Sequence, residues 1–209
     1  MPMPVSLTAK WTVTSFGVSL DSATFLTNST GVRIENGAST NRIGGVGSSE
    51  GNHIAGNSGD GITVVSNNST ANAFLANVIY ANTGLGIDLN DDGVTANDLG
   101  DGDTGPNGKQ NFPVLTAASV NGSSLIVTGS LNSTVSSTFH IEFFRVSSGQ
   151  VDPTGYGEGE SFLGSTNVTT DGSGNVAFNV AIPGVVIGSG DKITATATRD
   201  FGGGSYGSS

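Results

Sequence analysis

The stretch Gly51-Asn-His-Ile-Ala-Gly-Asn-Ser-Gly-Asp-Gly-Ile-Thr-Val64 is followed, 25 residues further on, by Ala76-Asn-Val-Ile-Tyr-Ala-Asn-Thr-Gly-Leu-Gly-Ile-Asp-Leu89. Six positions of the two copies are identical, among them two asparagines and two glycines. A repeat of this size, with apolar residues two apart, is typical of a solenoid whose units bury their apolar faces only by stacking. The spacing predicts short strands and not helices, because glycines interrupt every apolar run.

The repeat extends upstream, where Asn28-Ser-Thr-Gly-Val-Arg-Ile34 matches the second half of the first copy with one residue deleted. Two further Asn-x-apolar steps, at Asn41 and Asn72, indicate two or three strands in each coil and about three coils in all. We expect glycines and asparagines to form the corners, where φ is positive, and stacked asparagines to form hydrogen-bond ladders. Alternate strand residues face one side, which predicts inward stacks of Val32, Ile62 and Ile87 and of Ile34, Val64 and Leu89.

The composition limits the classes of protein to which this chain can belong. With 33 glycines and only 11% charged residues, it lacks the residues that helices prefer, and we expect an almost entirely β protein. The formal charge is −10, so the chain lacks the basic surface that nucleic-acid binding needs. A negative surface suits solubility or the binding of divalent cations. The absence of Cys excludes disulfides and thiolate chemistry. No apolar stretch is long enough to predict a transmembrane segment.

The second half of the chain has longer alternating strands, separated by turn signals such as Asn121-Gly122 and Asp171-Gly172. Six or seven strands in about 90 residues are typical of an antiparallel β-sandwich of immunoglobulin-like type. The predicted strands are Val114–Val120, Ser124–Leu131, Thr138–Val146, Phe162–Thr170, Asn175–Ile182 and Lys192–Thr198. The glycine-rich tail after Phe201 is predicted to form a last short strand or to be disordered.

The predicted fold class is therefore all-β, with a short right-handed parallel β-helix followed by an antiparallel Ig-like β-sandwich. Residues 1–89 are assigned to the β-helix, with residues 1–27 as an irregular cap in which Trp11 is a core residue. Residues 90–112 are assigned to an acidic linker that is a possible calcium loop, and residues 113–209 to the sandwich.

The acidic segment contains the strongest candidate site. Asp88, Asn90 and Asp92 take the alternating oxygen positions of a calcium loop, and Gly93 stands where the sharp turn needs glycine. The loop then departs from that motif, because Leu99 stands where a bidentate Glu is needed. Later oxygens can come from three further carboxylates, and the alternative is a solvated linker whose Asp and Asn favour turns. The predicted calcium (Ca2+) ligands are Asp88, Asn90, Asp92, Asp98, Asp101 and Asp103.

Catalytic groups are sparse. Parallel β-helix lyases combine carboxylate-bound calcium with an Arg or Lys base, and here Arg33 and Asp88 are expected to point outward on one sheet. The competing interpretation is that Arg33 and Asp88 are ordinary charged residues that keep the surface soluble. The two histidines fall in different halves: His53 is expected at an outward corner and His140 on the solvent face of a strand. We therefore predict no catalytic residues and no enzyme, with lyase-like activity as the alternative.

Three segments resemble right-handed parallel β-helix repeat proteins of bacterial surfaces, relatives of the pectate-lyase-like fold. Thr30 to Gly45 resembles the coils of these proteins, and Leu85 through Asp103-Thr-Gly-Pro-Asn107 to Val114 resembles the segment that closes such helices. Tyr156 to Thr166, followed by Ile193-Thr-Ala-Thr-Ala197, resembles the β-sandwich that commonly follows. The resemblance implies a large secreted protein in which a β-sandwich follows the helix. The chain resembles the C-terminal portion of such a protein, or a shortened relative.

The functional expectation is a non-catalytic structural or interaction module that docks to a protein partner or a larger assembly. Such a module is expected at an extracellular, cell-surface or periplasmic location in a bacterium. The alternatives are a glycan-binding or polysaccharide-lyase-like β-helix protein and a calcium-stiffened adhesin spacer.

Overall fold

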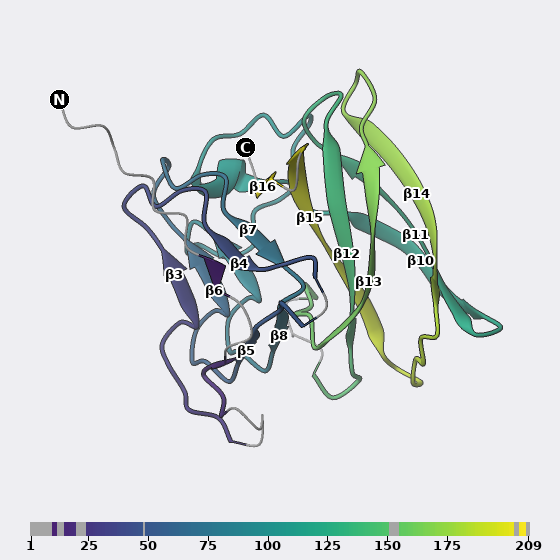
Figure 1. Cartoon of the computed structure of the whole chain (residues 1–209), viewed down its shortest axis with the longest axis horizontal. Helices are drawn as coiled ribbons and strands as arrows, with labels where there is room; N and C mark the ends of the chain where they lie inside the picture. Colours follow the sequence, from purple (N-terminus) through teal and green to yellow (C-terminus); the bar gives the residue numbers. More distant parts are fainter. Residues whose placement is uncertain are drawn as a thin grey trace.

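The computed structural model describes residues 10–11, 15–19, 24–47, 49–150, 155–202 and 205–207. The protein is all-β, with parallel sheets in the N-terminal part and antiparallel sheets in the C-terminal part, as predicted. Figure 1 shows a short solenoid on one side and two layers of long strands on the other. Much of the predicted N-terminal cap, including the side chain of Trp11, lies outside the described residues.

The solenoid is built from three parallel three-stranded sheets, ordered β1-β4-β7, β2-β5-β8 and β3-β6-β9. Each sheet contributes one strand to each coil, so the described residues form three coils. The strands are β1 (Lys10–Trp11), β2 (Ser15–Phe16), β3 (Val32–Ile34), β4 (Arg42–Gly44), β5 (His53–Ala55), β6 (Ile62–Val64), β7 (Ala73–Leu75), β8 (Val78–Tyr80) and β9 (Ile87–Leu89).

The predicted inward stacks are confirmed by the strand register. Ile62 pairs with Val32 on one side and with Ile87 on the other. Val64 likewise lies between Ile34 and Leu89. The solenoid core is the buried cluster of Ile34, Ile43, Ile54, Ile62, Val64, Phe74 and Ile79. Stacking of identical rows removes apolar surface from water at every coil, which is why the repeat in the sequence translates directly into the fold.

The glycines that both copies of the repeat share allow close stacking of the coils. The expectation that glycines supply positive φ is wrong for these four, which are Gly59, Gly61, Gly84 and Gly86. Gly61 has no positive φ. A Cβ built on Gly61 would lie 2.6 Å from Ile79 Cγ2 and 2.7 Å from the carbonyl oxygen of Gly86 in the next coil. Side chains at this position would therefore force the coils apart.

Five left-handed residues of the solenoid each stand one position before an asparagine that forms a ladder. They include alanine and threonine as well as glycine, with φ between 51° and 69°. These residues are Thr40, Gly56, Ala71, Ala76 and Ala81. A non-glycine residue in this region costs free energy, so the asparagine contacts that follow must hold the corners in place.

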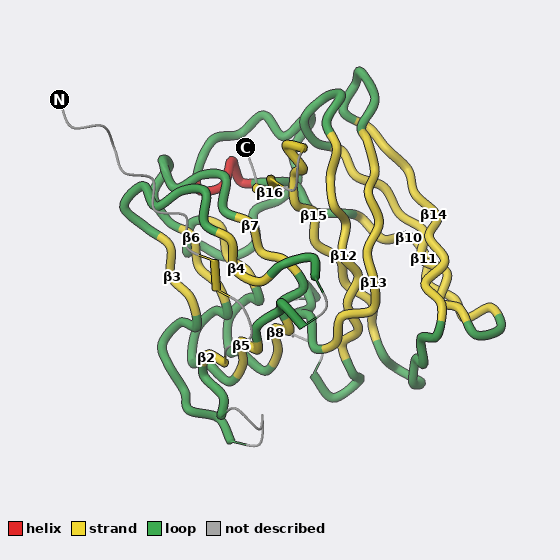
Figure 2. The backbone as a smooth tube through the Cα atoms, viewed as in Figure 1, coloured by secondary structure: helices red, strands yellow, loops and turns green. Residues whose placement is uncertain are grey.

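The second half forms two antiparallel sheets that pack face to face, and its strands are much longer than those of the solenoid (Figure 2). One sheet has the order β10-β11-β14 and the other β13-β12-β15-β16. The strands are β10 (Val114–Asn121), β11 (Ser124–Asn132), β12 (Thr138–Val146), β13 (Ser161–Thr169), β14 (Asn175–Pro183), β15 (Lys192–Gly202) and β16 (Ser205–Gly207). Between the halves, the one helical element of the described residues is the 3-10 turn η1 (Pro106–Lys109).

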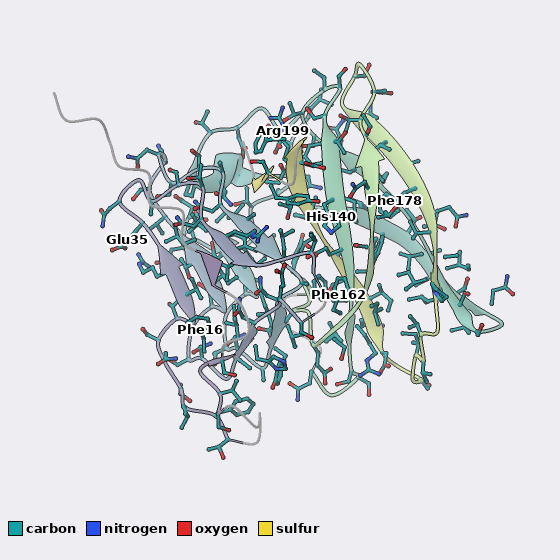
Figure 3. All side chains as sticks on the ribbon, in the orientation of Figure 1. Phe16, Glu35, His140, Phe162, Phe178 and Arg199 are labelled. Atoms are coloured by element: carbon teal, nitrogen blue, oxygen red, sulfur yellow. The ribbon has the colours of Figure 1, made fainter. Side chains whose placement is uncertain are left out.

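The sandwich core is a second buried cluster, separate from that of the solenoid. It consists of Leu125, Val127, Leu131, Phe139, Ile141, Phe143, Phe178 and Ile182. Figure 3 labels Phe178 in this core and Phe16, which packs against the solenoid core.

Strand β12 is buried on both faces because the last coil of the solenoid packs against its outer side. Phe139, Ile141 and Phe143 belong to the sandwich core. The intervening His140 and Glu142 are also buried, with 8% and 1% of their surface exposed. The expectation that His140 lies on a solvent face is therefore wrong. Alternation indicated which residues share a face, but Ala76 of the last coil contacts Glu142 and Tyr206 of β16 contacts His140, so this face does not meet water.

Candidate functional site

Ladders of asparagine side chains run along the solenoid, as predicted. Asn57 donates hydrogen bonds to Asn82 Oδ1 from its backbone N–H (3.0 Å) and from its side-chain amide (2.7 Å). Asn52 makes the same pair of bonds to Asn77 Oδ1, at 3.0 Å and 2.9 Å. The side-chain oxygen of each asparagine thus accepts hydrogen bonds from both the backbone N–H and the side-chain amide of the asparagine in the preceding coil.

In two ladders, the acceptor at the end of the last coil comes from outside the solenoid. Asn107 Oδ1, in η1, accepts the backbone N–H of Asn72 at 3.0 Å and its amide at 3.2 Å. Glu158 Oε1, in the loop before β13, accepts the backbone N–H of Asn82 at 3.3 Å and its amide at 2.7 Å. Both acceptors stand where the asparagine of a further coil would stand.

A third acceptor comes from the sandwich sheet itself. The carboxylate of Glu142 on β12 accepts the backbone N–H of Ala76 at 2.9 Å and 3.0 Å. A short antiparallel bridge between Ile79 of β8 and Gly159 adds two backbone hydrogen bonds of 2.8 Å. Buried backbone donors without acceptors are costly, so these contacts replace the hydrogen bonds that a fourth coil would supply.

The sequence indicated an open solenoid end that needs a cap or a partner, but it did not identify Glu142, Glu158 and Asn107 as the capping groups. For Glu142 no signal was present in the sequence, because a polar residue that alternates with Phe139, Ile141 and Phe143 is typical of the solvent face of an amphipathic strand. For Glu158 the flanking glycines indicated only a shaped loop.

A cavity of about 440 Å³ lies between the last coil and the sandwich. The solenoid contributes Phe74 and Ile87 to its wall, and the sandwich contributes Phe144, Tyr156 and Thr196. The hydroxyl oxygen of Thr196 is buried and has no hydrogen-bond partner among the described residues. The volume falls within the range of small-molecule sites.

The predicted calcium ligands do not form one cluster in the structure, and only three of the six come together. Asp98, Asp101 and Asp103 each offer a carboxylate oxygen within 4.8 Å of the others. Asp88 belongs to no such group among the described residues, and its two oxygens accept the backbone N–H groups of Asp91 and Gly93. The remaining two predicted ligands are joined to each other, since Asn90 donates to Asp92 Oδ2 at 2.7 Å.

The three grouped carboxylates differ in how far protein donors satisfy them. Asp101 accepts the backbone N–H of Asn111 at 2.9 Å and the hydroxyl of Ser133 at 2.7 Å. Oδ1 of Asp103 is buried and has no partner in the described part of the chain. Burial, and then the nearby carboxylates, raise the pKa of both Asp101 and Asp103. A bound cation would relieve this repulsion.

Arg33 and Asp88, the candidate pair of the lyase alternative, occupy one column of the solenoid with Thr63 between them. Arg33 is exposed and forms ion pairs with Glu35 and Asp91, at 2.8 Å and 2.9 Å. Asp88 is buried under its own loop. The pair therefore lies on one sheet as expected, but Asp88 does not point into solvent.

His140 lies beside the capping carboxylate. Its Nε2 is 3.5 Å from Glu142 Oε1, and its Nδ1 is 2.7 Å from Asn167 Oδ1. Burial alone lowers the pKa of His140, but the contacts with Glu142 and Asn167 outweigh it and raise the pKa. The ring of Tyr206, with its centroid 5.5 Å away, covers the histidine from β16.

These features define the class of protein: an all-β chain in which a short β-helix-like stack of parallel strands is capped by an antiparallel sandwich. Beyond this class, no known protein-family model matches the sequence. Among the described residues, no helix has the length and hydropathy needed to cross a membrane.

Proposed function

We propose that this protein is a non-catalytic structural module of an extracytoplasmic protein, docking to a protein partner or a larger assembly. The observation that carries the proposal is the capped end of the solenoid. The buried polar groups at the junction, among them Glu142 and Glu158, are hydrogen-bonded to the backbone of the last coil. Polar groups used in this way support a role in holding the two halves together.

The extracytoplasmic location and the bacterial surface origin rest on the sequence. A chain without Cys, rich in Gly, Asn, Ser and Thr and carrying a charge of −10, suits such an environment. The resemblance to β-helix repeat proteins of bacterial surfaces agrees with the parallel sheets of the described coils. In such a protein the solenoid and sandwich would act as one rigid body.

A calcium-stiffened spacer is the second candidate. The grouping of Asp98, Asp101 and Asp103, with a buried unpartnered oxygen on Asp103, favours it. A calcium ion there would tie the 98–103 loop to the start of the segment after β11, because Asp101 already contacts Ser133. This candidate is compatible with the first, since both are structural.

The experiment that tests the proposal measures turnover and unfolding of the full chain. The chain is incubated with uronate and neutral polysaccharides, with and without calcium, and unsaturated or reducing ends are measured. We expect no turnover, and a single unfolding transition that coincides by far-UV and near-UV circular dichroism. Turnover of any polymer would replace the structural proposal with the lyase-like alternative, and two separate transitions would contradict the single rigid body.

A further inference from the structure

The three-stranded sheet β10-β11-β14 carries no charged residue. The chain has no Asp, Glu, Lys or Arg between Gln110 and Ile141 or between Gly172 and Gly190, and these two ranges contain all three strands. The sheet forms the layer farthest from the solenoid (Figure 1). On a protein with a net charge of −10, this layer is where another acidic surface can approach with the least repulsion.

The outer face of this sheet is built from small and uncharged side chains in register. Thr128 of β11 lies between Ala117 of β10 and Asn179 of β14. The next row is Ser119, Ile126 and Ala181.

Strand β10 is an edge of this sheet, since in the described part of the chain it pairs only with β11. All of its residues except Leu115 are exposed. Natural edge strands are usually protected by charges, prolines or bulges. The irregularity of β10 lies between Leu115 and Ala117, so residues 117–121 remain a regular, uncharged strand that is open to pairing.

The core-facing side of β10 is also uncovered. Ala118 and Val120 pair with the buried Val127 and Leu125 and so face the same side as the sandwich core. Nevertheless Ala118 is exposed, and 57% of Val120 is exposed. A hollow of about 510 Å³ lies beside them, lined also by Ile187 and Ile193 and by one residue of each charge, Asp191 and Lys192. The opposite edge strand, β14, differs, because its core-facing Phe178 and Ile182 are buried.

We propose that a second copy of this chain binds at β10, by antiparallel pairing of the two β10 strands about a two-fold axis. This inference rests on the proposed function, for which it names the partner. The pairing would join both outer sheets into one continuous sheet and bring the two Val120 side chains beside each other's hollow. Such an interface is self-complementary, because the same strand is used on both sides. A basic partner would instead be drawn to the acidic surfaces of the protein.

The first test is sedimentation equilibrium of the full chain over a range of concentrations, comparing Ser119→Lys with Ala177→Lys. Both substitutions add one exposed lysine to the outer face of the same sheet, on β10 and on β14. We expect a reversible dimer whose dissociation constant rises at least about tenfold in the first variant and is unchanged in the second. Added salt should tighten the dimer, because it screens the repulsion between two acidic chains.

The second test maps the two-fold axis. The chain has no cysteine, so single-cysteine variants at 117, 118, 119 and 120 report only on contacts between copies. Mild oxidation should give most disulfide-linked dimer at one of these positions and none for Ala177→Cys. A monomer at every concentration, or a dimer that is insensitive to lysine at 119 and equally cross-linked at 177, would overturn the proposal. A monomer that neither cleaves polysaccharides nor unfolds in two steps would leave the proposed structural function intact.

Discussion

The carboxylate of Glu158 accepts hydrogen bonds from the backbone N–H and the side-chain amide of Asn82, which is what Asn82 itself does for Asn57 one coil below. A residue of the sandwich thus completes a ladder that began in the solenoid. Because Glu158 is 76 positions along the chain from Asn82, the cap forms only when both halves have folded and met. The junction therefore couples the stability of the solenoid to that of the sandwich.

Removal of the Glu158 carboxylate should destabilise the protein. Glu158→Ala leaves the two donors of Asn82 without this acceptor, and we expect a loss of about 2 kcal/mol, or a fall in Tm of roughly 4–8 °C. Glu158→Gln retains an acceptor oxygen and should lose less than about 1 kcal/mol. Urea denaturation followed by circular dichroism measures both.

The control for this prediction is Glu35→Ala, which removes an exposed carboxylate paired with Arg33. Its effect should stay within about 0.5 kcal/mol. Equal effects of the Glu158 and Glu35 substitutions to alanine would contradict the capping role.

Adding a methyl group at the stacking glycine should cost much more stability than removing one at the left-handed alanine. Gly61→Ala places a Cβ within 2.7 Å of the Gly86 carbonyl oxygen, and we expect a loss of about 1–3 kcal/mol. Ala81→Gly removes a Cβ at a φ of 54°. Relief of backbone strain there offsets the added entropy of the unfolded chain, so the change should stay within about 1 kcal/mol. Thermal denaturation of both variants decides whether φ or stacking requires the repeat glycines.

The raised pKa of His140 predicts a pH dependence of stability. A histidine whose pKa is raised by folding stabilises the folded state below its unfolded pKa of 6.5, and this contribution is lost as the pH rises through the folded pKa. Stability should therefore fall as the pH increases above 6.5. In His140→Gln this part of the profile should be flat. A wild-type slope retained in the variant would assign the effect to another group.

Calcium should stabilise the protein through the Asp98–Asp103 loop. Millimolar calcium is expected to raise Tm, because the cation offsets the repulsion that raises the pKa values of Asp101 and Asp103. In calcium-free buffer at neutral pH, Asp103→Asn should raise Tm by about 1–2 °C, since it removes a carboxyl whose ionised form folding disfavours.

The same variant should lose the calcium response, whereas Asp92→Asn, outside the group of three carboxylates, should keep it. An unchanged Tm on addition of calcium to the wild-type chain would remove the calcium-stiffened spacer from consideration.

The parallel stack was predictable from the sequence because its information is local and repeated. Two Asn, two Gly and two Ile of the phrase at 51–64 recur at 76–89, and the paired isoleucines lie in register in neighbouring coils. The strands of the sandwich were predictable for a similar reason, since alternation over nine residues, as in Thr138–Val146, needs no knowledge of distant neighbours.

The candidate site was only partly predictable. Six oxygen ligands between Asp88 and Asp103 were proposed from their spacing, yet only Asp98, Asp101 and Asp103 come together among the described residues. Asp88 instead closes its own loop through Gly93. Spacing along the chain does not specify the conformation of a loop. A carboxylate that can accept hydrogen bonds from nearby backbone N–H groups, as Asp88 does, is then not directed toward a shared cation site.

The sequence by itself determined that the protein is a solenoid of about three coils followed by a sandwich, because periodicity alone dictates which faces must be buried. Only the tertiary structure decided what covers the end of that solenoid. The docking of one sheet against the last coil buries His140 and Glu142 on a strand face that alternation left to solvent. It also leaves β10 as the exposed, uncharged edge. These outcomes depend on contacts between residues far apart in the chain, where the free energy of burying unpaired backbone groups selects the partner and no local pattern records the choice.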